Sequence, residues 1–239
     1  MITMRPAGKL LFLLTALFAS ANVAATMSLD RMIIYFKSDQ LPRQDVVVTN
    51  PDAENLYLQT EVYKVIRPGT EKEERVRISD PAALKLLTTP NKAVVPPKSR
   101  KTVRLVSLET PKDKELVYRV TFKPVVGELE ATQNAIKLLV AYQALVFVRP
   151  QNPEYKLSGK IENGTITFTN SGNINVVLRN GRYCTSNKSG SCTKLDAGNR
   201  IYAGESWTLP LPEGAKKGQG YIQYGLFDGE LEKAKKFPI

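Results

Sequence analysis

The feature that most restricts the fold of this chain is a series of short segments in which apolar and polar residues alternate, each ended by a turn signal. Asn55–Ile66 reads NLYLQTEVYKVI and stops at Arg67-Pro68-Gly69. A period of two in a segment rich in β-branched and aromatic residues predicts a strand with one buried face. Further strands are predicted at Gln44–Thr49, Thr102–Ser107, Leu116–Lys123, Thr165–Thr169, Ile174–Arg179, Ser206–Leu209 and Tyr221–Tyr224. Such spacing favours β-sandwiches over βαβ units, and only Asp80–Leu87 could form a short helix.

Two prolines near the middle of the chain divide these strands into two series. Pro150 and Pro153, in the sequence RPQNP, make a short, stiff connector. A chain of 239 residues is long enough for two domains that each bury a core. The sequence therefore predicts an all-β protein with sandwich domains at residues 26–148 and 155–239, joined by a linker at 149–154.

The first 25 residues have the order of a secretory signal peptide. Arg5 and Lys9 make the N-terminal segment positively charged. The apolar run Leu10–Phe18 that follows is too short to span a bilayer. Small residues come next, with Val23 and Ala25 at the positions that signal peptidase prefers. A buried core helix is the alternative. We expect residues 1–25 to be a signal and the mature protein to be exported.

Export determines how the two cysteines are interpreted. Cys184 and Cys192 are the only cysteines, and an even pair in an oxidising compartment is most simply a disulfide that closes a hairpin loop. A metal site would need two more soft ligands, and the chain has no further cysteine and no histidine. We therefore predict a disulfide and no metal site.

The absence of histidine also excludes the commonest catalytic groups. There is no Ser-His or Cys-His nucleophilic pair, and no phosphate loop of the form G-x-x-x-x-G-K-[ST]. We expect no catalytic residue, no cofactor and no small-molecule substrate. The formal net charge of +11 comes from scattered lysines and arginines, which indicate a solvated surface. Export makes nucleic acid a poor candidate for a partner.

The segment Asn134–Pro150, NAIKLLVAYQALVFVRP, differs from the other predicted strands. It is largely apolar on both alternating faces and predicts a strand of about fifteen residues, where five or six are usual. One interpretation is a central strand that the protein's own layers cover on both faces. The other is that a partner protein covers part of the strand through β-strand addition. The residues alone leave both interpretations open.

Several motifs together give the chain a resemblance to a known family. They are Ser28-Leu29-Asp30-Arg31, Leu87-Thr88-Thr89-Pro90, Val95-Pro96-Pro97, Ser99–Leu105 (SRKTVRL), Val117-Tyr118-Arg119-Val120 and a long strand that closes with Arg149-Pro150. With the signal and the two sandwiches, they resemble a PapD-like periplasmic pilus chaperone. Leu116–Phe122 (LVYRVTF) and Tyr142-Gln143-Ala144-Leu145 are more similar to the alternate, colonisation-factor type than to the P-pilus type. The resemblance implies two immunoglobulin-like sandwiches in an L-shaped arrangement.

The resemblance also implies a function and a set of protein partners. Members of this family lend a strand to incomplete pilin subunits, keep them from associating prematurely, and deliver them to an outer-membrane usher. The residues that fill the groove of the pilin would be Ile136, Leu138, Val140 and Tyr142. An unloaded chaperone could also pair with itself through the same edge. The alternative is a secreted β-sandwich adhesin or carbohydrate-binding protein, which the single tryptophan, Trp207, supports weakly.

A departure from the family pattern concerns the cleft that binds the terminal carboxylate of the pilin. P-pilus-type members use an arginine on the first strand and a lysine on the long strand. In this chain those places hold Ile33 and Leu145, and Arg31 is the nearest cation. The residue that anchors the pilin is therefore unidentified at this point, and a solvated surface role for Arg31 is the simpler interpretation.

A second site implied by the resemblance lies next to the connector. Arg149 resembles the arginine that family members use in an internal ion pair between the domains, with partners at Glu115 and Asp228. Such a pair would fix the angle between the domains, which is a geometric role more than a large contribution to stability. An ordinary exposed ion pair is the alternative.

Overall fold

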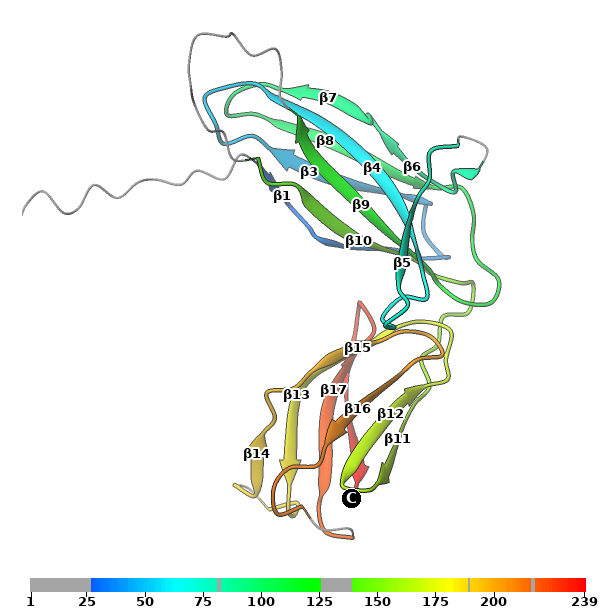
Figure 1. The fold of residues 1–239 in the computed structure, drawn as a ribbon, viewed down its shortest axis with the longest axis vertical. Helices are drawn as coiled ribbons and strands as arrows, with labels where there is room; N and C mark the ends of the chain where they lie inside the picture. The colour runs from blue at the N-terminus through cyan, green and yellow to red at the C-terminus, as the bar shows by residue number, and fades with distance from the viewer. Residues whose placement is uncertain (1–26, 81–82, 126–138, 189, 216–217) are drawn as a thin grey trace, which may run out of the picture.

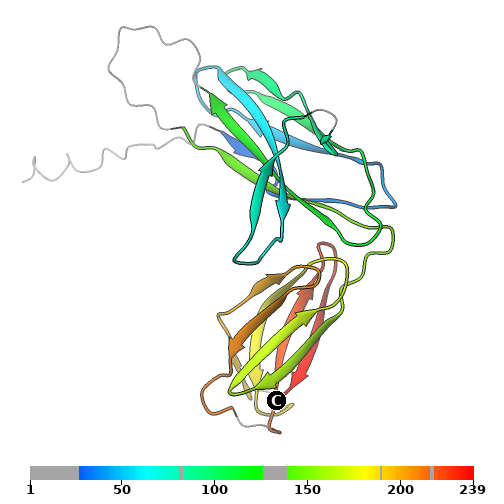
Figure 2. The same ribbon diagram turned by 45° about the vertical axis from the view of Figure 1, so that its right-hand side comes forward.

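The computed structural model describes residues 27–80, 83–125, 139–188, 190–215 and 218–239. These residues form eighteen β-strands and no α-helix. Ten strands precede Arg149 and eight follow it, in two sandwiches joined end to end at an angle (Figures 1 and 2). The predicted all-β architecture is therefore confirmed. Among these residues no helix has the length and apolar character needed to cross a membrane, and the predicted signal peptide lies outside the described residues.

The first sandwich packs a four-stranded sheet against a six-stranded one. The four-stranded sheet has the order β1-β3-β8-β6, and the larger sheet has the order β2-β10-β9-β4-β5 with β7 also paired to β4. Among the described strand pairs of this sandwich, only β2 and β10 run parallel. The strands are β1 (Ser28–Leu29), β2 (Ile33–Phe36), β3 (Arg43–Thr49), β4 (Leu56–Ile66), β5 (Glu74–Arg77), β6 (Leu86–Thr89), β7 (Lys92–Val95), β8 (Arg100–Ser107), β9 (Leu116–Val125) and β10 (Tyr142–Val148).

The core of the first sandwich forms from the alternate residues of these strands. On β4, Leu58 and Val62 are buried whereas Tyr57 is exposed. Phe122 on β9 and Val146 on β10 are fully buried and belong to the same cluster. Because successive side chains of a strand point to opposite faces, the face of the six-stranded sheet turned away from this core carries Tyr63, Arg119 and Leu145. We call it the outer face.

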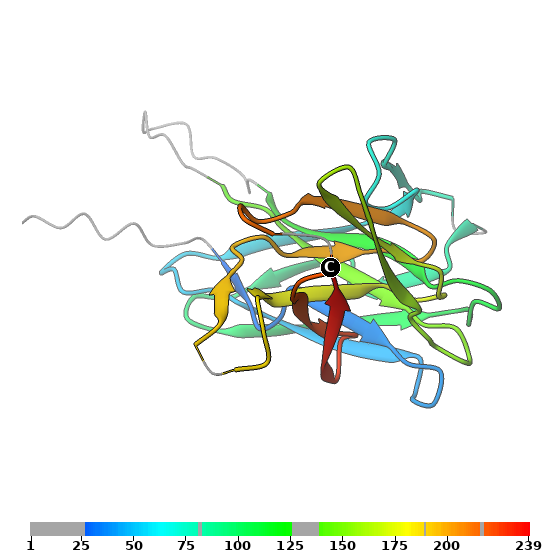
Figure 3. The same cartoon turned by 90° about the horizontal axis from the view of Figure 1, so that it is seen from below.

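The second sandwich packs a three-stranded sheet against a five-stranded one. The first has the order β11-β12-β16, and the second has the order β14-β13-β17-β18 with β15 also paired to β13. Seen from below in Figure 3, this sandwich lies in front of the first, and the C-terminus is at its free end. The strands are β11 (Leu157–Glu162), β12 (Thr165–Asn170), β13 (Val176–Cys184), β14 (Cys192–Lys194), β15 (Asn199–Ile201), β16 (Ser206–Pro210), β17 (Tyr221–Phe227) and β18 (Glu232–Pro238).

An aromatic cluster fills the core of the second sandwich. Phe168 is fully buried, with its ring centroid 5.5 Å from that of Tyr224 and 4.9 Å from that of Phe237, both edge to face. The ring of Trp207 stacks on Phe168 at 5.8 Å and meets Tyr224 edge to face. The single tryptophan is therefore half-buried and packs on the core, where its ring is engaged by Phe168 and Tyr224.

Two predicted elements are shorter in the structure than the sequence suggests. The short helix considered at Asp80–Leu87 does not reach its predicted end, because Leu86 is fully buried in β6 and paired with β8; Ala83 N donates a hydrogen bond to Asp80 O, and residues 81–82 lie outside the described residues. The fifteen-residue strand is also shorter than predicted, since residues 139–141 are not in a strand and β10 begins at Tyr142. Residues 134–138 of that prediction lie outside the described residues.

A disulfide joins Cys184 at the end of β13 to Cys192 on β14, as the sequence predicts. The two residues are partners in the antiparallel register, so the bond closes the connection between these strands.

Replacing both cysteines with serine should lower the free energy of unfolding by about 2–3 kcal/mol, because the bond restricts the unfolded chain. Urea denaturation measures the difference. A reducing agent should destabilise the wild type by a similar amount and leave the double variant unchanged. Equal denaturation curves for wild type and double variant would contradict a stabilising role for the bond.

Candidate functional site

Strand β10 is paired along its whole length on one side only. β9 pairs with it from Tyr142 to Val148, whereas β2 pairs with it only from Leu145 to Val148. Within the described strands, the edge of β10 at Tyr142–Ala144 therefore has no partner on the β2 side. The backbone N–H and C=O groups of an unpaired edge are a template for a strand from another chain. This open edge is the feature around which the site is built.

Two of the four predicted groove-filling residues, Val140 and Tyr142, are in the described part of the chain at this open edge. Ile136 and Leu138 lie outside the described residues. Val140 is 42% exposed, which is high for a valine, and it precedes the first residue of β10. Tyr142 is half-buried and packs against the first core. Val140 is thus available to a partner, while Tyr142 is partly engaged by the protein's own sandwich.

The three residues predicted for the carboxylate cleft do not form a cationic site. Ile33 and Leu145 are neighbours in the parallel register of β2 and β10, with Ile33 45% exposed and Leu145 buried. Arg31 pairs with Asp30, Nε to Oδ2 at 3.1 Å, on the exposed connection between β1 and β2. The apolar pair therefore lies at the end of the open edge, and the nearest cation in the sequence is engaged elsewhere.

An apolar cluster continues from this pair to the second sandwich. Val65, Val117, Leu145 and Phe147 lie on the outer face and are buried together with Tyr202, which follows β15. The Phe147 and Tyr202 ring centroids are 6.3 Å apart, and Tyr35 stacks on Phe147 at 5.2 Å. The inner corner between the sandwiches is therefore packed. Its formation could not be foreseen, because Tyr202 lies far from the others in the sequence.

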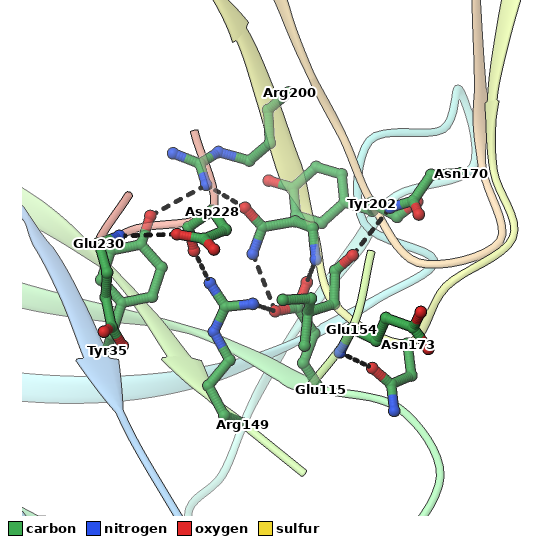
Figure 4. A network of polar contacts seen from close by, with 12 residues as sticks. Tyr35, Glu115, Arg149, Glu154, Asn170, Asn173, Arg200, Tyr202, Asp228 and Glu230 are labelled. Atoms are coloured by element: carbon green, nitrogen blue, oxygen red, sulfur yellow. Dashed lines mark hydrogen bonds and ion pairs between the residues drawn. The ribbon is translucent and has the colours of Figure 1, made fainter. Parts of the chain in front are cut away.

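A polar network crosses the same corner (Figure 4). Glu115, just before β9, and Arg149, just after β10, are almost completely buried, and Arg149 Nη1 lies 3.4 Å from Glu115 Oε2. Both carboxylate oxygens of Glu115 also accept hydrogen bonds from Asn175 of the second sandwich, Oε1 from its main-chain N at 2.6 Å and Oε2 from Nδ2 at 2.8 Å. Glu115 thus bridges the first sandwich to the second.

The contact with Asp228 differs from the predicted ion pair. Arg149 Nη2 donates to the main-chain carbonyl of Asp228, while the carboxylate of Asp228 accepts hydrogen bonds from the main-chain N of Glu230 and of Leu231, each at 2.9 Å. The Asp228 carboxylate is thus occupied by the main-chain N–H groups of the turn that follows it. The guanidinium of Arg149 bonds the main-chain carbonyl of Asp228 instead (Figure 4).

Arg200, on β15, is a member of the network that sequence reasoning missed. Its Nη1 donates to Asn175 Oδ1 and, at 3.3 Å, to the Tyr35 hydroxyl of the first sandwich, and its guanidinium lies 4.8 Å from the centroid of the Phe147 ring. Arg149 similarly lies 4.9 Å from the centroid of Tyr35. Two arginines therefore stack on aromatic rings of the first sandwich around one buried carboxylate. No local pattern marks Arg200, because its partners come from three distant segments.

Burial dominates the protonation of this network. It raises the pKa of Glu115 above its ordinary value of 4.5, against the opposing effects of Arg149, the two Asn175 hydrogen bonds and Arg200. Burial likewise lowers the pKa of Arg149, and Glu115 opposes that shift. A buried pair of this kind orients the groups it joins more than it stabilises the protein, because desolvation offsets the attraction.

Comparison with known proteins identifies a family that shares this architecture. Residues 26–154 match the family described as "Pili and flagellar-assembly chaperone, PapD N-terminal domain". A CS1 fimbrial protein of Escherichia coli, named as the B component of those fimbriae, is 27% identical over 190 residues, 75% of this chain and 78% of that protein. The corresponding A component of the CFA/I fimbriae, from the same organism, is 28% identical over 200 residues, 74% of this chain and 83% of that protein.

Solved structures show the same fold. The class 5 fimbriae chaperone CfaA has a TM-score of 0.67 and 23% identity, covering 89% of this chain and 99% of that one. A chain from the chaperone–tip adhesin complex of CFA/I fimbriae biogenesis has a TM-score of 0.63 and 24% identity, covering 90% of this chain and 100% of that one. The E. coli chaperone DraB has a TM-score of 0.61 at 16% identity, covering 90% and 99%. At these identities the likeness concerns the fold.

The raised pKa of Glu115 predicts how the free energy of unfolding depends on pH. The effect is measured as the difference between the wild type and the Glu115→Gln variant, which cannot titrate at this position. Between pH 4.5 and the raised pKa the native state holds a proton that the unfolded state has lost, so stability falls as pH rises through that window. The wild type should therefore lose stability relative to Glu115→Gln as pH increases from about 4.5. Urea denaturation of both proteins from pH 4 to 8 measures this. A relative stability that rises with pH would show that the ion pair outweighs desolvation.

Proposed function

Since the chain belongs to the family of pilus and flagellar-assembly chaperones that share the PapD N-terminal domain, we propose that it acts in the periplasm on incomplete pilin subunits. It binds each pilin by donor-strand complementation, prevents premature self-association, and delivers the pilin to an outer-membrane usher. The donor residues are Ile136, Leu138, Val140 and Tyr142. The protein works by binding and is not an enzyme.

The observation that carries this proposal is the open edge of β10. Those backbone groups of Tyr142–Ala144 that point away from β9 have no strand partner in the described part of the sheet, and the exposed side chain of Val140 precedes them. A pilin that lacks one strand needs both an edge to pair with and apolar side chains to fill its groove. The edge and the exposed apolar residue occur together here.

The energy available matches the task. Four apolar side chains at about 1.5–3 kcal/mol each supply at most roughly 6–12 kcal/mol before ordering costs, and Tyr142 supplies less than the others because it is already half-buried against the first core. Because side chains alternate along a strand, a slip of one residue would present Lys137 to the apolar groove, so the register is strongly specified. The pilin is released when the N-terminal extension of another pilin replaces the donor residues, an exchange that needs no ATP.

The relatives support the choice of partner. Three of the solved structures with this fold are described as complexes, two of a chaperone with a tip adhesin or tip adhesion subunit and one of Salmonella enterica SafA pilin with the SafB chaperone. A pilin is the corresponding partner for this chain. In its absence, the same open edge would allow two copies of the chaperone to pair.

The donor residues can be tested with matched variants. Val140→Asp and Leu138→Asp should each reduce the amount of pilin that co-purifies from the periplasm at least tenfold, because a carboxylate would enter an apolar groove. Val94→Asp is the control, since Val94 is 49% exposed on β7 in another part of the sheet. Circular dichroism checks that all variants fold. Undiminished recovery of the pilin with folded Val140→Asp and Leu138→Asp would remove the assignment.

The network at the inner corner should control the angle between the sandwiches. Glu115→Ala removes the carboxylate that joins Arg149 to Asn175. We expect small-angle scattering to show a wider distribution of domain angles, and fibre yield to fall. Lys160→Ala serves as the control, because Lys160 forms an exposed ion pair with Glu162 on β11. An unchanged scattering profile together with unchanged fibre yield would count against the hinge role.

A further inference from the structure

We propose that Gly69 and Gly229 are positioning residues that fix the angle between the two sandwiches and thereby keep the open edge of β10 accessible to a pilin, a role that rests on the proposed function. Each glycine lies in the turn of a hairpin, Gly69 between β4 and β5 and Gly229 between β17 and β18. Both turns lie at the junction of the two sandwiches (Figure 1). Each one meets a tyrosine ring of the sandwich that it faces.

The turn of the first sandwich leaves no room for a side chain at Gly69. A hydrogen bond from Thr70 N to Arg67 O (3.4 Å) closes this turn, and Gly69 has a φ of 77°. A Cβ atom at Gly69 would lie 2.8 Å from Cε2 of the buried Tyr202 ring and closer still to Cδ2. Carbon atoms in contact are normally about 3.5–4.0 Å apart. A residue larger than glycine would therefore push Tyr202, and the second sandwich with it, away from the first.

The turn of the second sandwich makes the reciprocal contact. Gly229 has a φ of 110°, and a Cβ atom there would lie 2.6 Å from Cζ of Tyr35 and 2.8 Å from its Cε1. The next residue, Glu230, anchors the same turn to the first sandwich through an ion pair of its Oε1 with Lys37 Nζ at 2.8 Å. The Tyr35 ring and the turn therefore meet with no space for a side chain between them.

A series of aromatic contacts joins the two glycines. The ring of Phe147, fully buried on β10, has its centroid 5.2 Å from that of Tyr35 and 6.3 Å from that of Tyr202. The order of contacts is therefore Gly69, Tyr202, Phe147, Tyr35 and Gly229, with a glycine turn at each end and β10 in the middle. Because a close-packed interior transmits strain, extra volume at either end changes the position of the second sandwich relative to β10.

This series meets β10 directly after its open edge. Tyr202 is buried together with Leu145, the residue that follows the open edge at Tyr142–Ala144. A wider angle between the sandwiches would remove the cover of Leu145, and a narrower one would bring the second sandwich towards the edge that a pilin has to reach. Either change lowers the affinity for the pilin, so binding depends on the angle that the two glycines set.

The need of a turn for glycine has to be separated from the contact with the ring. Gly164, in the turn between β11 and β12, has a φ of 74°, and a Cβ atom placed there has no described atom of another segment within 4 Å. Gly164→Ala therefore introduces backbone strain similar to that of Gly69→Ala without a new contact. It is the matched control.

The test uses the full-length chaperone, free and in complex with a pilin that the wild type retains. Gly69→Ala should change the small-angle scattering of the free chaperone and raise the dissociation rate of the pilin roughly fivefold or more, while Gly164→Ala stays within about twofold of the wild type. Tyr202→Val removes Cδ2 and Cε2. In that background Gly69→Ala should have no larger effect than Gly164→Ala, whereas a role confined to the turn would give the same loss in both backgrounds.

The second glycine gives an independent test. Gly229→Ala should act like Gly69→Ala in the wild type and should add nothing in a Tyr35→Leu background, because that variant lacks the Cζ and Cε1 atoms that the new methyl group would meet. Circular dichroism shows whether each variant folds. If a glycine variant does not fold, Tyr202→Val and Tyr35→Leu carry the test, since they leave both turns unstrained and should each change the scattering profile.

The outcomes separate this role from the proposed function. Additive losses in the double variants, or scattering profiles of Gly69→Ala and Gly229→Ala identical to that of the wild type, would overturn the positioning role and leave the proposed function intact. A changed angle with an unchanged dissociation rate would overturn the link to pilin binding. Failure of the wild type to retain any pilin would overturn the proposed function, which the scattering of the free chaperone does not measure.

Discussion

The unequal length of the two strands beside β10 is the constraint on which the rest of the structure depends. β9 covers one edge of β10 completely, while β2 covers the other only from Leu145 onward. Backbone polar groups that lack a partner strand must find water or another chain, and an apolar side chain beside them, here Val140, makes water the poorer choice. Under the function proposed above, this edge stays open because a pilin supplies the missing strand.

The inner corner between the sandwiches complements this edge. Under the proposed function, a pilin can pair with the open edge of β10 only if the second sandwich does not cover that edge. The inner corner holds the two sandwiches through both apolar packing and polar contacts. Tyr202 covers Phe147 and Leu145, while Glu115 joins Arg149 to Asn175 in a buried position. Because desolvation offsets the attraction between buried charges, this network defines an orientation more than it adds stability. Gly69, with a φ of 77°, lies against the Tyr202 ring where a larger residue would not fit.

The sequence predicted the strands that have a clear period and missed those that do not. Gln44–Thr49 and Asn55–Ile66 reappear as β3 and β4 because one face of each is buried and the other is not. β18 was missed because, among its seven residues, only Phe237 is buried, so charged residues on both faces hide the period. The short helix considered at Asp80–Leu87 does not extend to Leu86, because pairing with β8 overrides the local preference there. At the site, Arg149 and Glu115 were found through resemblance, whereas Arg200 and Tyr202 were not.

The sequence by itself determined the all-β class, the division of the strands near Pro150 and the pairing of its two cysteines, because period, proline and composition are local properties of the chain. Only the tertiary structure decided where β2 ends along β10, and hence which part of the edge is open. It also decided which charges and polar groups meet, bringing Arg149 to Glu115 and Arg200 to Asn175. These outcomes depend on the register of strands that lie far apart in the chain, and on burial, which changes what an unpaired charge costs.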